Sequence, residues 1–417
     1  MRIGPLVEPP SAPPRRARWA VSLISAANGI LVGTWAARIP AIQQHLGLDS
    51  GALGMALLCA AVGLLVATNV AGYLATRIGS SVVTTISGLL FCCTVPLLAL
   101  APSLPWLALA LALYGATGGS WGVAMNTQGV AVEHCYGRPI LTSFHAFFSA
   151  GGLVGASVGG LAGGRGIAPL AHFTAISAFA AVFLVVAARH LLPAKADAGG
   201  SSSSLVLPSG AILMLGVIAF CTVLSEGAVS DWSAIYLQHT VATGAALAAG
   251  GYAAFSLLMV AGRIVGDSLT ARSGAKAVVR AGSLMAATGI ALALLIPWAP
   301  LAIIGFALVG AGLSSVFPIV ISAAGRSSDN SSGNAIAAVA TCGYVGFLVG
   351  PPSIGFLAQA ASLRAALLLI VALSLLAAAL SPRVGGDTKT LVAGWSCWDA
   401  RPGIMRTWRK TTKPPRR

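Results

Sequence analysis

The sequence predicts an all-α membrane protein with twelve transmembrane helices, arranged as two pseudo-symmetric bundles of six. Three observations predict this fold: few charged residues, long apolar runs, and a repeat between the two halves of the chain. Of the 417 residues, 57% are hydrophobic and 8% are charged, and the mean hydropathy is +0.87. Soluble domains carry about 25% charged residues, so lipid must cover most of the surface of this chain.

The apolar runs are continuous and long, which favours helices. A spanning helix needs about 20 mostly apolar residues. A membrane β-barrel would instead show strands of about ten residues with alternating polarity. The expected helices cover residues 19–38, 51–75, 82–101, 105–132, 140–163 and 168–190, and then 209–230, 245–266, 277–296, 298–322, 334–357 and 364–381.

A break in composition separates the two sets of helices. The run Gly199–Ser204 is typical of a flexible coil. The predicted organisation is a tail (1–18), a six-helix bundle (19–191), a linker (192–208), a second six-helix bundle (209–381) and a basic tail (382–417).

The basic residues predict the orientation. With the N-terminus in the cytoplasm, most Lys and Arg residues fall on the cytoplasmic side, and only Arg38, Arg165 and Arg364 face the other side. The positive-inside rule then places both termini in the cytoplasm of a multi-pass protein of a bacterial inner (plasma) membrane. The same rule accounts for the net charge of +15 without nucleic acid.

The chain lacks the signatures of a catalytic protein. Its seven cysteines show no metal-binding spacing, and no Gly-x-x-x-x-Gly-Lys-Ser/Thr motif is present. We therefore expect no metal, no cofactor and no enzymatic activity.

The two bundles repeat each other in sequence. A shift of 195 residues places Gly151 on Gly346 and Gly155 on Gly350, and it places Gly115 on Gly310. A constant offset that pairs helix n with helix n+6 indicates two parallel repeats. This layout is typical of transporters whose binding site lies at the midplane between the halves.

The segment Gly72–Gly79 resembles the loop signature Gly-x-Leu-Ala-Asp-Arg-x-Gly of the major facilitator superfamily, with Thr76 in place of the acid. The segment 262–274 is a more complete copy, because it keeps Asp267. Within that superfamily, the segments 35–40, 126–130, 143–149 and 226–232 resemble the fucose-permease-like bacterial members. The resemblance implies a monomer that carries a monosaccharide-like or other small polar solute together with protons.

Glu226 is the sharpest signal for a transport site, because it lies deep within the seventh apolar segment. A carboxylate in the membrane costs at least ~2.5 kcal/mol, so it normally faces a cavity and serves a function. We expect Glu226 to bind and release the coupled proton as its exposure changes. It could alternatively bind a solute hydroxyl, or pair with an Asn or Arg of a neighbouring helix.

Four further polar residues are predicted to contact the substrate: Asn28, Asn126, His145 and Tyr344. Asn28 lies near the midplane, and Asn28-Gly29 aligns with Glu226-Gly227 after a small shift. The repeat counterpart of His145 is Ala340, so the fold does not need a histidine there. For each residue, core packing or an interhelical hydrogen bond is the competing interpretation.

Two gates are predicted at the ends of the bundles. The outer gate consists of Trp35, Arg38 and Asp231, with an Arg38–Asp231 pair across the opening. The cytoplasmic gate consists of Gly72, Arg77, Gly79, Arg263, Asp267 and Arg272. Basic residues at helix ends can pair with acids of the facing half; alternatively, they only mark topology.

These features together predict secondary active transport by alternating access. The expected partners are a small solute, protons and the lipid bilayer. Proton-driven efflux of amphipathic compounds is one alternative. The other is a non-transporting membrane sensor on the same fold, which the missing acid at Thr76 favours slightly.

Overall fold

The computed structural model describes residues 14–136, 140–193, 210–326 and 332–384, and all regular structure in these ranges is helical. The first half contains α1 (Arg15–His45), α2 (Ser50–Ile78), α3 (Ser80–Leu100), α4 (Leu104–Tyr136), α5 (Leu141–Gly164) and α6 (Pro169–Ala188). The second half contains α7 (Gly210–Ile235), α8 (Ala245–Ser273), α9 (Ala275–Leu295), α10 (Ala299–Leu313), α11 (Val316–Arg326), α12 (Ser332–Ala360) and α13 (Leu363–Leu380). A π-helix, η2 (Tyr236–Thr240), extends α7, and a 3-10 helix, η3 (Ser381–Val384), follows α13.

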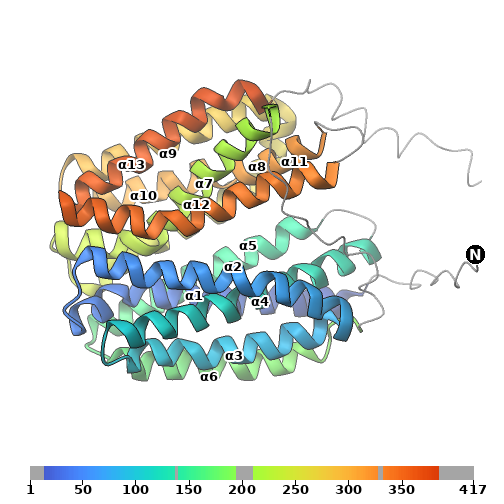
Figure 1. Cartoon of the computed structure of the whole chain (residues 1–417), viewed down its shortest axis with the longest axis horizontal. Coiled ribbons are helices and arrows are strands. Elements are labelled where there is room, and N and C mark those ends of the chain that lie inside the picture. The colour runs from blue at the N-terminus through green and yellow to red at the C-terminus, as the bar shows by residue number, and fades with distance from the viewer. Residues whose placement is uncertain (1–13, 137–139, 194–209, 327–331, 385–417) are drawn as a thin grey trace, which may run out of the picture.

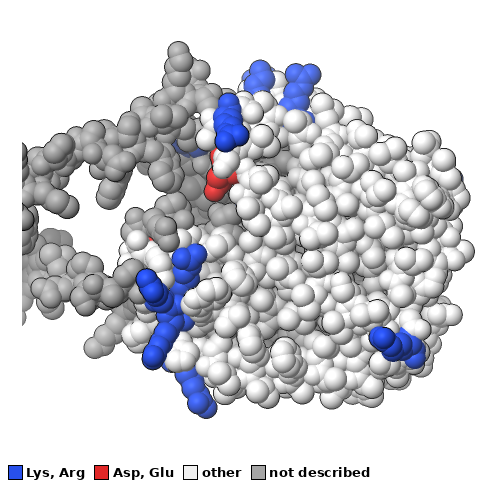
Figure 2. Space-filling view, turned by 180° about the vertical axis from the view of Figure 1, so that it is seen from behind, with Lys and Arg blue, Asp and Glu red and all other residues white. Residues whose placement is uncertain are grey.

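Twelve spans in the described residues are long and apolar enough to cross a membrane, with α10 and α11 forming one span together. The predicted fold class is therefore confirmed. The two halves lie beside each other, α1–α6 in one and α7–α13 in the other (Figure 1). On the face seen in Figure 2, Lys and Arg side chains gather towards the ends of the molecule, and the broad band between them is uncharged.

Several predicted helix boundaries are wrong. Helix α1 begins at Arg15, so Arg15, Arg16 and Arg18 are helical instead of part of a tail. Helix α8 continues to Ser273 instead of ending at 266, and the predicted helix 298–322 is divided between α10 and α11. Apolar runs mark only the lipid-covered part of a helix, and the backbone hydrogen bonds continue beyond it. Most of the predicted linker (194–208) and of the C-terminal tail (385–417) lies outside the described residues.

The two halves use the same helix pairs. In the first half, α1 packs on α5, α2 on α4, and α3 on α6. In the second half, α7 packs on α12, α8 on α10, and α9 on α13. The turns also match, because Gly79 after α2 and Gly274 after α8 both have a positive φ, 96° and 83°. Glycine adopts this conformation without steric cost, so the sequence repeat corresponds to a structural repeat.

The contacts between glycines and facing helices correct the predicted alignment of α1 with α7. A Cβ at Gly151 would overlap Ala26, and a Cβ at its counterpart Gly346 would meet Phe220, which is 194 residues after Ala26. The offset between α1 and α7 is therefore 194, one less than the 195 between α5 and α12. The counterpart of Glu226 is then Val32 instead of Asn28, and Asn28 lies about one turn away.

The one-residue difference is taken up by the π-helix η2 at the end of α7. Asp49 and Gly244 precede α2 and α8 and are again 195 residues apart, so the extra residue lies between Leu224 and Gly244. A π turn closes hydrogen bonds from residue i to i+5, so it holds one more residue than an α turn. The helix continues through the insertion without a break.

The ends of the bundle differ in their contacts between halves. We call the end where α1 begins and α2 ends the linker end, and the opposite end, where α1 ends and α2 begins, the closed end. At the closed end α2 packs against α12: Gly54 lies beside Pro351 and Gly355, and Gln359 donates a 3.1 Å hydrogen bond to Asp49. Towards the linker end these two helices diverge (Figure 1).

Candidate transport site

Glu226 forms an ion pair in the middle of the membrane-spanning bundle. Its Oε1 lies 3.6 Å from Nη2 of Arg263 on α8. The two side chains are 35% and 16% exposed, Glu226 the more open. Among the described residues, this is the one pair between an acidic and a basic side chain within 4.0 Å.

Arg263 also reaches across to the first half of the molecule. Its Nη1 donates to Ser149 Oγ at 2.5 Å and to the carbonyl oxygen of His145 at 3.3 Å, both on α5. A single guanidinium therefore joins α7, α8 and α5. Since Arg263 touches α5 and Glu226 together, the carboxylate lies on the side of α7 that faces the first half.

Charge and packing explain this placement. An arginine and a carboxylate within a bilayer are costly when isolated, and each lowers the cost of the other when they are paired. Arg263 lies about ten residues before the end of α8, so it is within the span Ala245–Ser273 instead of in a loop. The prediction of a gate residue at the end of a helix therefore does not describe the position of Arg263, which lies deeper in the span.

The neighbouring contact between the halves is built from small and hydroxyl-bearing residues. A Cβ at Gly152 of α5 would lie 3.1 Å from the Tyr252 hydroxyl and 3.5 Å from Ser256 Oγ, both on α8. Nearer the closed end, Gly160 lies beside Ala246 and Ala249 of α8. Glycine on α5 thus allows α8 to approach closely and brings Tyr252 to the boundary between the halves.

The four predicted substrate residues lie in different surroundings. Asn28 is buried, His145 is half-buried, and Asn126 and Tyr344 are exposed. Of the four, His145 is the one with a described hydrogen bond to the Glu226–Arg263 pair, which it makes through its backbone carbonyl. The four side chains make no hydrogen bond with one another in the described part of the chain. Tyr344 is the repeat counterpart of Ser149 at an offset of 195, which places it on the equivalent face of α12.

The predicted outer-gate residues lie towards the closed end, and the predicted Arg38–Asp231 pair is absent there. Arg38 is 5% exposed, and its Nη2 donates instead to the carbonyl oxygen of Ile167 at 2.6 Å. Trp35 is also buried, 6.2 Å from the ring of Tyr114 and 6.5 Å from that of Phe173. Arg38 and Trp35 of α1 therefore contact residues of the first half, whereas Asp231 is half-buried on α7 of the second half.

The remaining predicted gate residues lie at the linker end. Gly79 and Gly274 cap α2 and α8, while Arg77 packs its guanidinium over the ring of Tyr73 at 5.3 Å. Asp267 and Arg272 on α8 are exposed, and Gly72 on α2 is partly buried. Within the described residues, no ion pair involves Arg77, Asp267 or Arg272. All three lie at the end of the bundle where α2 and α12 diverge.

Two polar residues near this end have structural roles. Gln128 bonds Ser80 Oγ at 2.7 Å and both accepts from and donates to the backbone of Leu192, so it fastens the chain that follows α6. Glu133 accepts from the backbone N–H groups of Ile140 and Leu141 at 2.6 and 2.7 Å. It thereby satisfies N–H groups at the start of α5 that no helical carbonyl can reach.

Sequence reasoning missed Ser149 and the central position of Arg263. Ser149 carried no signal of its own beyond its place in the segment 143–149, since a serine in an apolar helix usually bonds its own backbone. The position of Arg263 did carry a signal in the sequence. The argument that singles out Glu226, a charge within a membrane span, applies equally to an arginine ten residues from a helix end. No group of three or more His, Cys, Asp or Glu side chains that could hold a metal occurs in the described ranges.

The architecture and the sequence both match a known family. The model of the Major Facilitator Superfamily matches residues 21–346 and 215–394. The chain belongs to the major facilitator superfamily. An uncharacterised MFS-type transporter of Yersinia pestis is 37% identical over 357 residues, which cover 85% of this chain and 92% of that protein. The membrane protein MosC of Rhizobium meliloti is 33% identical over 358 residues, with 85% and 86% coverage.

Solved structures share the fold at low sequence identity. A bacterial homologue of the human lysosomal transporter Spinster, in an inward-facing and occupied conformation, matches with a TM-score of 0.70 at 14% identity, covering 90% of this chain and 97% of that one. The nucleoside transporter NupG matches with a TM-score of 0.66 at 15% identity, covering 89% and 100%. These structures show the fold alone, whereas the family model and the relatives show that this chain is a multi-pass transporter of the superfamily and not an enzyme.

Proposed function

We propose that the protein is a proton-coupled secondary transporter of a small polar, sugar-like solute. The Glu226–Arg263 pair at the boundary between the halves carries this proposal, because Arg263 also bonds α5 of the opposite half. Arg263 joins the two halves of the transporter and pairs with the carboxylate of Glu226, which can bind a proton. This placement allows proton binding to be coupled to movement of the halves. Asn28, Asn126, His145 and Tyr344 remain the proposed substrate contacts.

The proposed cycle uses alternating access. Ionised Glu226 holds the guanidinium of Arg263. Protonation of the carboxylate removes that attraction and leaves Arg263 bound to Ser149 and His145 alone. Solute hydroxyls then compete for the same donors, so that binding and rocking of the halves are linked. Trp35, Arg38 and Asp231 would gate the closed end, and Arg77, Asp267 and Arg272 would gate the linker end.

The proposed location is the bacterial inner membrane, with both termini in the cytoplasm. Most of the described Lys and Arg side chains lie at the linker end, including Arg15, Arg77, Lys276 and Arg326. Arg165 and Arg364 lie at the closed end, together with the buried Arg38. The positive-inside rule then assigns the linker end to the cytoplasm, where α2 and α12 diverge.

Ligand-induced thermal stabilisation of the purified protein tests this proposal. The panel holds sugars, polyols, nucleosides, small organic acids and amphipathic cations, at acidic and neutral pH. A ligand that binds only the folded state raises its melting temperature. We expect a polar, sugar-containing compound to stabilise the protein with a pH dependence that Glu226→Gln removes. Stabilisation by amphipathic cations alone would favour efflux, and binding without flux in vesicles would favour a sensor.

A further inference from the structure

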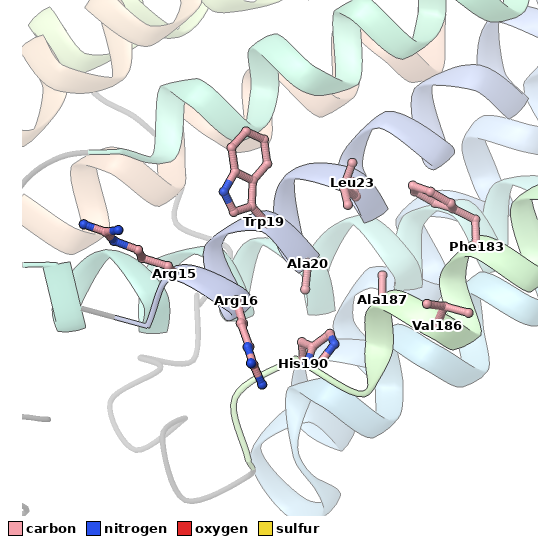
Figure 3. A pocket seen from close by; sticks show the side chains of 9 residues that line it. All are labelled: Arg15, Arg16, Trp19, Ala20, Leu23, Phe183, Val186, Ala187 and His190. Carbon is pink, nitrogen blue, oxygen red and sulfur yellow. The ribbon is translucent and has the colours of Figure 1, made fainter. Parts of the chain in front are cut away.

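A groove runs along the outside of the first half between α1 and α6, away from the transport site (Figure 3). Its volume is about 270 Å³. The walls are apolar and include Ala20 and Leu23 of α1 and Phe183 and Val186 of α6. Both helices are membrane spans, so this stretch of the groove opens towards acyl chains instead of water.

The linker-end mouth of the groove is cationic. Arg15 and Arg16 from the first turn of α1 and His190 after α6 line it. Arg16 extends towards the side of His190, whereas Arg15 extends away from both (Figure 3). All three are exposed, and no hydrogen bond or ion pair with another described residue occupies their side chains. None of the described residues that line the groove is acidic.

An exposed tryptophan marks the level of the membrane surface at this mouth. Trp19 is 59% exposed and is held edge-on against Phe147 of α5, with ring centroids 6.1 Å apart. Tryptophan gathers at the level of the lipid headgroups. The cationic side chains therefore lie where a headgroup phosphate lies, and the apolar walls lie where its acyl chain begins.

The second half fills the equivalent groove with its own chain. The N-caps of α6 and α13, Ala168 and Ser362, are 194 residues apart, the same offset as between α1 and α7. At this offset His190 corresponds to Val384 and Arg16 to Gly210. Val384, in η3, is 1% exposed and packs in a cluster with Leu215, Ile218 and Ala377. The same helix pair thus has a filled apolar groove in one half and an open groove with a cationic mouth in the other.

We propose that this groove binds a phospholipid with an anionic headgroup. Arg16 and His190 would contact the phosphate, Arg15 would add positive charge beside them, and one acyl chain would lie along Ala20, Leu23, Phe183 and Val186. Clusters of basic residues between helix ends attract anionic lipids through the headgroup charge. The proposal is independent of the transported solute and of Glu226.

Native mass spectrometry of the detergent-purified full chain tests the proposal. The protein is titrated with phosphatidylglycerol or with phosphatidylcholine of the same chain length, and bound lipids are counted. The test variant is Arg15→Gln/Arg16→Gln. The matched control is Lys276→Gln/Arg280→Gln, which removes two exposed cations from the start of α9 at the same end. Inorganic phosphate is added in a separate arm as a competitor.

We expect phosphatidylglycerol to bind more tightly than phosphatidylcholine, and R15Q/R16Q to weaken its binding roughly tenfold or more, from the loss of two basic side chains. K276Q/R280Q should leave that affinity within about twofold. Equal loss in both variants would mean a general charge effect and would overturn the site. Equal binding of both lipids, or displacement by phosphate alone, would overturn the anionic-lipid assignment.

Discussion

The pair α1–α5 in the first half and the pair α7–α12 in the second half are built on one plan but packed differently. Between α1 and α5, a Cβ at Gly29, Gly33, Gly151 or Gly155 would overlap a backbone carbonyl of the facing helix. In the second half, Val223 occupies the position equivalent to Gly29. The nearest atoms to a Cβ at Gly350 are those of the Leu224 side chain, at 3.3 Å.

This difference in packing gives the two halves different roles. The first-half pair is in backbone contact, which leaves little freedom for one helix to move against the other. The second-half pair makes such a backbone contact at Gly346, but side chains space it at Gly227 and Gly350. Its α7 carries Glu226 and Asp231, whose first-half counterparts are Val32 and Ala37. The first half thus offers a tightly packed surface, with Ser149 and the His145 carbonyl as acceptors, and the second half supplies the charges.

Replacing matched glycines should reveal the difference in packing between the two helix pairs most strongly. In Gly155→Ala, the new Cβ meets the carbonyl of Ile30, and the helices must move apart, at a cost of about 1–3 kcal/mol. In Gly350→Ala, the Cβ meets the movable Leu224 side chain, and the cost should stay below about 1 kcal/mol. Melting temperatures of the two variants in one detergent compare them directly. Equal losses would contradict the difference in packing.

Removing Arg263 should have the next largest effect, because it leaves Glu226 without its partner and α5 without two hydrogen bonds. We expect Arg263→Ala to lose roughly 1.5–3 kcal/mol of stability, the range for hydrogen bonds to charged groups. Arg263→Lys keeps the charge but not the planar fork that reaches Ser149 and Glu226 together. It should recover part of the stability, and less of the transport. Full recovery of both by lysine would show that only the charge matters.

The contact between Asp49 and Gln359 should have the smallest effect. Asp49 Oδ1 caps α2 by accepting from Ala52 N–H at 2.7 Å, while Oδ2 accepts from Gln359 on α12. Gln359→Ala removes only the contact between halves and should cost about 0.5–1 kcal/mol. Asp49→Ala also removes the helix cap and should cost about 1 kcal/mol more. Spin-label distances across the closed end should widen in both variants, and identical melting temperatures would refute the double role of Asp49.

Much of the fold could be predicted from the sequence because it depends on one-dimensional properties. Apolar length gives the spans, and the spacing of Gly79 and Gly274 gives the repeat. The offset between α1 and α7 could not be predicted, since a single extra residue is absorbed by the π-helix η2 without any break in apolar character. Glu226 was found from its burial cost alone. Its partner was not, because pairing depends on how α7, α8 and α5 are rotated, which hydropathy does not specify.

Proton-driven accumulation in vesicles tests the central claim most directly. A solute identified by thermal stabilisation is offered to vesicles containing the wild type or Glu226→Gln, with and without an imposed pH gradient. We predict that the wild type accumulates the solute against its own gradient only when the pH gradient is present. Glu226→Gln should lose this accumulation and keep exchange of internal for external solute, which needs no net proton movement. Accumulation by Glu226→Gln at the wild-type level would contradict the account.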